Sequence, residues 1–150
     1  MSPPNPPPPP PRATAPTPAQ LLSAAAVVLR NDEPVLDGRR SVTSAALTRQ
    51  AVEASVDDWL QANGMEGRSN RREAFLCLAA LHPDPDLARQ LHNVWARLSS
   101  ACHAISYDLP PTAQELERWM AVVHRFVNDD PAANTQGTDQ RPDRGTISFP

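Results

Sequence analysis

Apolar residues recur every three to four positions through most of the chain between residues 17 and 129, which is the spacing of amphipathic α-helices. No segment alternates apolar and polar residues as a half-buried strand does. Short polar or proline-containing segments interrupt the pattern and divide it into about five stretches. We therefore predict an all-α fold, a bundle of about five helices with short connections.

Capping residues mark the beginnings of these helices. Thr17 precedes Pro18 and Asp84 precedes Pro85, so each pair places an N-cap side chain before a proline in the first turn. Gly64 is placed to end the longest helix, because glycine readily adopts the left-handed conformation of a C-terminal cap. The expected helices cover residues 17–31, 38–63, 70–81, 84–107 and 112–128.

The two ends of the chain differ from this body. Ten of the first eighteen residues are proline, and residues 6–11 are all proline. Because proline lacks an N–H and has a fixed φ, we expect residues 1–16 to form a disordered or polyproline II arm. Such an arm can dock in an aromatic groove or act as a spacer. Residues 130–150 have no apolar periodicity and are expected to be a disordered tail, which leaves residues 17–129 as one helical domain.

Charge and composition narrow the classes of function. The net charge is −3, and all fourteen basic residues are arginines spread along the chain, so no basic run indicates a nucleic-acid surface. This arginine, alanine and proline usage is typical of a GC-rich bacterial genome. No apolar run approaches the length of a membrane span, and prolines occupy the place of a signal peptide, so we expect a cytoplasmic protein. Cys77 and Cys102 lack metal-site spacing and are expected to be reduced thiols.

A strip of mostly polar residues runs along the helix expected over residues 84–107. Its residues follow at three-to-four spacing, which is also what a solvated helix face shows. The strip contains Arg89, His92, Ala96, Ser99, Ser100, His103 and Tyr107.

Three kinds of chemistry compete with the solvated face. A metal site is disfavoured because His92 and His103 are eleven residues apart, about 16 Å along a helix, and we expect no metal or other cofactor. Ser99 lies one turn before His103, as a Ser–His nucleophile would, but no acid is placed to orient the imidazole. The third possibility is proton transfer by His103, with Arg97 or Arg89 stabilising charge on a phosphate.

Polar residues also interrupt the apolar stripe of the longest helix. Arg49 and Glu53 lie one helical turn apart in that helix. They could hold the strip around His103 in place through a buried hydrogen-bond network, or they could be an ordinary helical pair at the boundary of the core.

The order of these helices and a few motif residues resemble a known family. The long early helix reads "RRSVTSAALTRQAVEASVDDWLQANG", and a later helix carries Arg97 and His103. A "YDLPPT" turn then leads into a last helix, "AQELERWMAVV". Together these features, over roughly residues 19–128, resemble the HEPN superfamily of helical bundles, especially small stand-alone bacterial members of an actinobacterial type.

This resemblance implies a homodimer, and it leaves two functions open. Active HEPN proteins cleave RNA without metal, using an arginine and a histidine spaced as R-x4-6-H at the dimer interface. Arg97 and His103 fit that spacing, with Ser99 or Ser100 placed to position the substrate, as in a defence or toxin–antitoxin ribonuclease. Because the two residues differ in direction by about 120° on one helix, a shared site would need two protomers, or Arg89 from the turn before His92 in place of Arg97.

The family also contains catalytically silent members that serve as binding modules. A non-catalytic or weakly active dimerising module would bind a partner protein, such as a cognate antitoxin, or a nucleotide or RNA. In that case Arg89, His92, Tyr107, Arg49 and Glu53 are the further candidates for binding. The sequence leaves open whether the protein is an enzyme.

Overall fold

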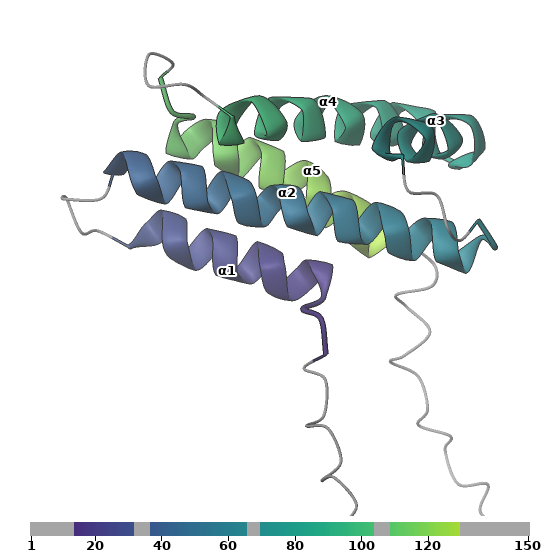
Figure 1. Cartoon of the computed structure of the whole chain (residues 1–150), viewed down its shortest axis with the longest axis horizontal. Helices are drawn as coiled ribbons and strands as arrows, with labels where there is room; N and C mark the ends of the chain where they lie inside the picture. Colours follow the sequence, from purple (N-terminus) through teal and green to yellow (C-terminus); the bar gives the residue numbers. More distant parts are fainter. Residues whose placement is uncertain (1–13, 32–36, 66–69, 104–108, 130–150) are drawn as a thin grey trace, which may run out of the picture.

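The computed structural model of the chain describes residues 14–31, 37–65, 70–103 and 109–129, and these residues form five α-helices and no strand (Figure 1). The predicted all-α fold is confirmed. Residues 1–13 of the expected arm, residues 130–150 of the expected tail, and Tyr107 lie outside the described residues. The helices are α1 (Pro18–Arg30), α2 (Asp37–Ala62), α3 (Arg71–Leu81), α4 (Pro85–Cys102) and α5 (Ala113–Asp129).

The long helix α2 is the centre of the bundle and contacts each of the other four helices. Helix α5 packs against α1, α2 and α4, whereas α1 and α4 do not touch each other. Figure 1 shows α1 and α4 on opposite sides of α2 and α5. The short α3 packs on α2 and α4 near the end of the bundle that is far from the α4–α5 connection.

The helices begin where the capping residues predict. The backbone N–H of Gln20 donates to Oγ1 of Thr17 at 3.2 Å, and the backbone N–H of Thr17 donates to the Gln20 side chain at 2.9 Å. At the start of α4, the backbone N–H of Leu87 donates to Oδ1 of Asp84 at 2.9 Å. Each cap satisfies N–H groups that the first helical turn leaves without a partner.

Gly64 ends α2 as expected and adopts a φ of 71°. Its N–H donates to the carbonyl of Gln61 at 3.0 Å, and the N–H of Met65 donates to that of Leu60 at 2.9 Å. This pair of hydrogen bonds is the Schellman motif, which uses carbonyls at the end of the helix that would otherwise lack donors.

The apolar stripes of all five helices meet in one core. Trp59 is buried, whereas Trp95 and Trp119 are partly buried and pack against the core. Phe126 is fully buried and extends the stripe of α5. The largest fully buried apolar side chains are Phe126, Leu22, Leu78, Leu87, Leu91, Leu98, Leu116, Val52, Val56 and Val123.

Small polar side chains lie in the contact between α1 and α2. Ser44 is fully buried, and its hydroxyl donates to the carbonyl of Ala25 on α1 at 3.0 Å. Thr48 is also fully buried and donates to the carbonyl of Ser44 at 2.8 Å. The buried hydroxyls of Ser44 and Thr48 therefore both have a partner.

Helix α4 ends five residues earlier than predicted. The predicted helix continued to Tyr107, but α4 ends at Cys102, and His103 is its C-cap with φ −104° and ψ 5°. The chain has to reverse between α4 and α5, and Pro110 and Pro111 close this connection without any backbone N–H. Ending the helix at Cys102 leaves enough chain for that reversal.

Candidate functional site

The strip predicted on α4 is divided between two sides of the helix. Two strip residues, Ala96 and Ser100, line a groove toward α5, together with Arg97 and with Asn93, which lies one turn before Arg97. His92 instead packs on α3, where its ring stacks on Phe75 with 4.9 Å between centroids. The side chains that looked contiguous in sequence therefore belong to two different surfaces.

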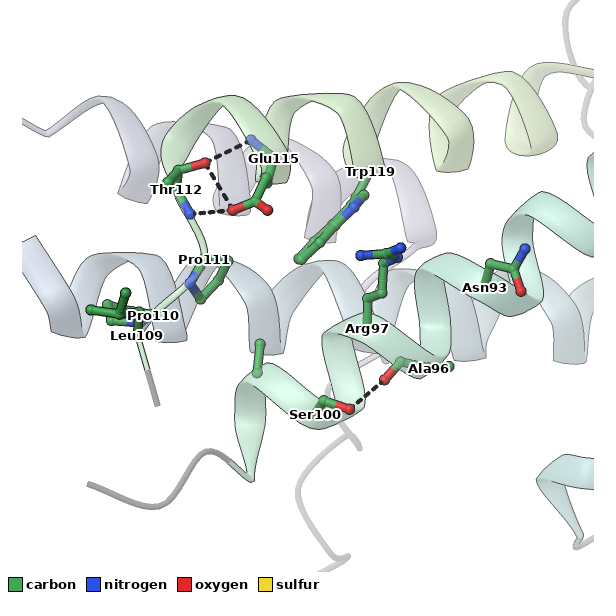
Figure 2. Close-up of a pocket in the computed structure, with 11 residues that line it drawn as sticks. Asn93, Ala96, Arg97, Ser100, Leu109, Pro110, Pro111, Thr112, Glu115 and Trp119 are labelled. Carbon is green, nitrogen blue, oxygen red and sulfur yellow. Dashed lines mark hydrogen bonds between the residues drawn. The ribbon is translucent and has the colours of Figure 1, made fainter. Parts of the chain in front are cut away.

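Arg97 and Ser100 lie in an open groove of about 930 Å³ between α4, α5 and the segment that leads into α5. We call it the α4–α5 groove (Figure 2). Its apolar surface comes from both helices and from the connection, where Leu109 is 93% exposed. The groove is lined by Asn93, Ala96, Arg97, Ser100, Ala101, Leu109, Pro110, Pro111, Thr112, Glu115 and Trp119.

Two hydrogen-bond donors in this groove have no acceptor in the described part of the chain. Figure 2 shows the side chains of Arg97 and Trp119 reaching from α4 and α5 toward each other. Arg97 is exposed and Trp119 is partly buried, and neither the guanidinium nor the indole N–H makes a hydrogen bond. Because neither group can accept a hydrogen bond, both are complementary to a ligand that presents acceptors.

The one carboxylate that lines the groove is held by the cap of α5. Oε2 of Glu115 accepts hydrogen bonds from the backbone N–H and the hydroxyl of Thr112, each at 2.9 Å. These hydrogen bonds lower the pKa of Glu115, and the positive charges of Arg97 and Arg118 lower it further. Glu115 is therefore ionised at neutral pH, and it forms a capping box with Thr112.

The two serines proposed for catalysis have different surroundings. The hydroxyl of Ser100 lies in the groove but donates to the carbonyl of Ala96 at 3.1 Å, within the same helix. The hydroxyl of Ser99 is buried and has no hydrogen-bond partner in the described residues. Within the described residues neither serine hydroxyl is hydrogen-bonded to an imidazole, the contact that would activate it as a nucleophile.

His103 does not line the α4–α5 groove. Its side chain is exposed at the end of α4, and its backbone N–H donates to the carbonyls of Ser99 and Ser100. The structure does not bring His103 and Arg97 together in one pocket of the described residues.

Arg49 and Glu53 reach α4, but at Trp95 rather than at His103. Oε1 of Glu53 accepts from Nε of Arg49 and from the indole Nε1 of Trp95, both at 3.0 Å. The guanidinium of Arg49 lies 6.0 Å from the centre of the Trp95 ring. Arg49 and Glu53 thus form an i, i+4 pair at the boundary of the core, and Glu53 also links α2 to α4 through Trp95. Among the described residues this pair makes no hydrogen bond to His103.

Arg89 forms an ion pair on the exposed surface of α4. It forms an ion pair with Asp86 at 2.9 Å, one turn away on α4, and both side chains are largely exposed. Such a pair adds little stability because water screens it. Arg89 does not line the groove that contains Arg97.

Sequence reasoning missed several residues of the groove. Asn93 lies four residues before Arg97, a spacing that places two residues on the same helix face, so periodicity counted from Arg97 could have found it. Trp119 belongs to the apolar stripe of α5, and periodicity alone does not distinguish a groove residue on such a stripe from a core residue. Leu109, Pro110 and Pro111 lie in a connection, where periodicity carries no information.

In the described parts of the chain, no three His, Cys, Asp or Glu side chains gather closely enough to hold a metal ion. None of the helices described here is both long and apolar enough to cross a membrane. Cys77 and Cys102 are free thiols, each partly buried against the core.

Comparisons with known proteins complete the description of the site. No family model matches this chain, and neither a curated protein nor a solved structure gives a significant match.

Proposed function

We propose that this protein is a non-catalytic, HEPN-like dimerising module that binds a segment of a partner protein in the α4–α5 groove. The observation that carries the proposal is the pair formed by Arg97 and Trp119, whose donors face an open groove and have no acceptor in the described residues. Peptide backbones present carbonyl acceptors, and aromatic and arginine side chains are the usual anchors of protein interfaces.

The charges that line the groove favour a protein segment over RNA. A surface for nucleic acid gathers several Lys or Arg side chains, because each neutralises a phosphate. Among the described residues that line the groove, Arg97 is the one basic side chain, and Glu115 adds a negative charge. The exposed apolar surface of Leu109 and Pro110 adds area that a peptide segment can cover.

A metal-independent ribonuclease is the second candidate function. The side chains of Arg97 and His103 are both exposed and make no hydrogen bond or ion pair in the described residues. Both also lie in the last two turns of α4 or directly after them. If two copies paired through this end of α4, His103 of one copy could meet Arg97 of the other, which is the arrangement that active HEPN proteins use.

An RNA cleavage assay in chelator separates the two candidates. We expect no cleavage by the wild type, by Arg97→Ala or by His103→Ala. Arg89→Ala is the matched control, because it removes an arginine from the same helix outside the groove. Cleavage that persists in chelator, survives in Arg89→Ala and disappears in the other two variants would contradict the proposal and establish the ribonuclease.

Binding in the groove is tested by selecting displayed random peptides on the purified full chain. We expect the selected peptides to bind the wild type and to lose most of their affinity for Arg97→Glu. Arg118→Glu is the matched control, because it makes the same charge change at an exposed position of α5 that does not line the groove. Peptides that bind both variants as well as they bind the wild type would contradict a site in this groove.

A further inference from the structure

We propose that the α4–α5 groove receives residues Pro6–Pro11 of a second copy of this chain. This inference rests on the proposed function, since it names the segment that the groove binds. Two observations lead to it: the hydrogen-bond donors that the groove presents, and a run of six prolines in the same chain.

The groove and the proline run have complementary hydrogen-bonding groups. A run of prolines has no N–H, so its backbone offers acceptors alone, beside apolar pyrrolidine rings. Arg97 and Trp119 are donors that cannot accept, and the amide of Asn93 adds a further donor. Polyproline II segments typically dock in aromatic-lined grooves because their backbone is already extended and loses little entropy on binding.

The length of the proline run also matches the length of the groove. The α4 side of the groove extends from Asn93 to Ala101, nine residues whose eight helical steps rise about 12 Å along the helix axis. Polyproline II rises about 3.1 Å per residue, so about four residues cover this distance. The run of Pro6–Pro11 therefore fills the groove with residues to spare. Arg12, which follows the run, has the charge opposite to that of Glu115 at the α5 side of the groove.

The geometry assigns the run to a second copy rather than to the same chain. Helix α1 contacts α2 and α5 and does not touch α4, so the arm joins the bundle on the side opposite α4. Figure 1 shows residues 14–17 leading away from α4. Two residues, Arg12 and Ala13, join Pro11 to Thr14, and these three Cα steps span at most about 10 Å. Helices α2 and α5 separate α1 from α4, and packed helix axes lie about 8–10 Å apart. With the whole run seated, these three steps are therefore too short to carry the chain around the bundle to its own groove.

If each copy places its run in the groove of the other, the contact is reciprocal and closes into a twofold dimer. The proposal thereby gives a physical basis for a homodimer. It also makes Arg97 a binding residue for that dimer rather than a catalytic one.

Sedimentation equilibrium of the full chain tests the exchange. Three variants are compared with the wild type: Arg97→Glu in the groove, the matched control Arg118→Glu, and a variant with serine at every position of Pro6–Pro11. We expect a dimer for the wild type and for Arg118→Glu, and self-association weakened by roughly tenfold or more for the other two. The serine variant changes residues outside every helix, and circular dichroism checks that the Arg97→Glu protein is folded.

An equimolar mixture of the Arg97→Glu and serine variants gives the decisive measurement. The Arg97→Glu chain keeps its proline run, and the serine variant keeps its groove. In the mixture the run of the first can bind the groove of the second, whereas neither variant alone can form this contact. We expect the mixture to associate more tightly than either variant alone. A monomeric wild type, a serine variant that dimerises like the wild type, or a mixture that gains nothing would each overturn the exchange. If random peptides still bind the groove through Arg97, the proposed function stands and this inference alone fails.

Discussion

The indole Nε1 of Trp95 on α4 donates a hydrogen bond to Oε1 of Glu53 on α2 at 3.0 Å. The two residues are 42 positions apart in the sequence, so the hydrogen bond joins distant helices. The same oxygen also accepts a hydrogen bond from Nε of Arg49 at 3.0 Å. The carboxylate thus has two donors in a partly buried position, which is the condition for burying a charged group at low cost.

Trp95→Phe should therefore lower the free energy of unfolding more than the same change at Trp119. Phenylalanine keeps most of the ring but removes the donor to Glu53, and the loss should be about 1 kcal/mol. At Trp119 the indole has no hydrogen-bond partner in the described residues, so Trp119→Phe should change stability by about 0.5 kcal/mol or less. Urea denaturation of both variants measures the difference. Equal losses would mean that the hydrogen bond to Glu53 contributes nothing.

Asp84 should make the stability of the protein depend on pH in the acid range. The hydrogen bond from the Leu87 backbone lowers the pKa of Asp84 below its ordinary value of 3.8, and the charge of Arg125 lowers it further. Because the folded pKa is the lower one, the ionised form stabilises the fold above pH 3.8, and this contribution is lost as pH falls through the folded pKa.

The measurement is the difference in unfolding free energy between the wild type and Asp84→Ala as a function of pH. We expect the wild-type advantage to be constant near neutral pH and to shrink as the pH falls below 3.8. An advantage that stays the same down to the acid-unfolding region would show that the charge of Asp84 does not support the start of α4.

Gly64→Ala should destabilise the protein through backbone conformation alone. A Cβ at this position would meet no atom within 4 Å, so no clash is expected. The φ of 71° is in the left-handed region, where an alanine costs roughly 1 kcal/mol. Gly64→Asn should cost less, because asparagine tolerates this conformation better. Chemical denaturation measures the stability of each variant. A Gly64→Ala protein as stable as the wild type would contradict a cost of the left-handed conformation at this position.

His82→Ala should be more destabilising than His124→Ala. The ring of His82 lies 5.6 Å from that of Trp59 and 5.3 Å from that of Phe126, and its Nδ1 accepts from the backbone N–H of Asp84 at 3.0 Å. Loss of these contacts should cost about 2 kcal/mol. His124 is exposed on α5, so its removal should cost about 0.5 kcal/mol or less. Thermal unfolding of both variants measures the two losses of stability. Similar losses would show that the ring contacts and the hydrogen bond of His82 do not stabilise the fold.

The beginnings of the helices could be predicted because they depend on neighbouring residues. Thr17, Asp84 and Thr112 each bond to a backbone N–H three residues ahead, so the sequence alone contains both partners. The end of α4 was missed because it depends on a long-range requirement. The chain must turn back so that α5 can pack against α4 and α2, and helical propensity after Cys102 contains no information about that reversal.

The candidate site was harder to predict than the fold. Arg97 and Ser100 were correctly placed on one helix, but the groove also needs Trp119 from α5 and Pro111 from the connection. The pairing of Glu53 with Trp95 likewise depends on how α2 crosses α4, and a helical wheel of either helix does not contain this information.

The sequence by itself determined the class of the fold, the number of helices in the described chain and the starts of those helices. Capping and periodicity are properties of residues within about one turn of each other, so they need no knowledge of the packed bundle. Only the tertiary structure decided that Arg97 faces Trp119 in a groove while His92 packs on Phe75. Those neighbours depend on how helices distant in sequence rotate to bury their apolar stripes, and that rotation is set by the packing of the whole core.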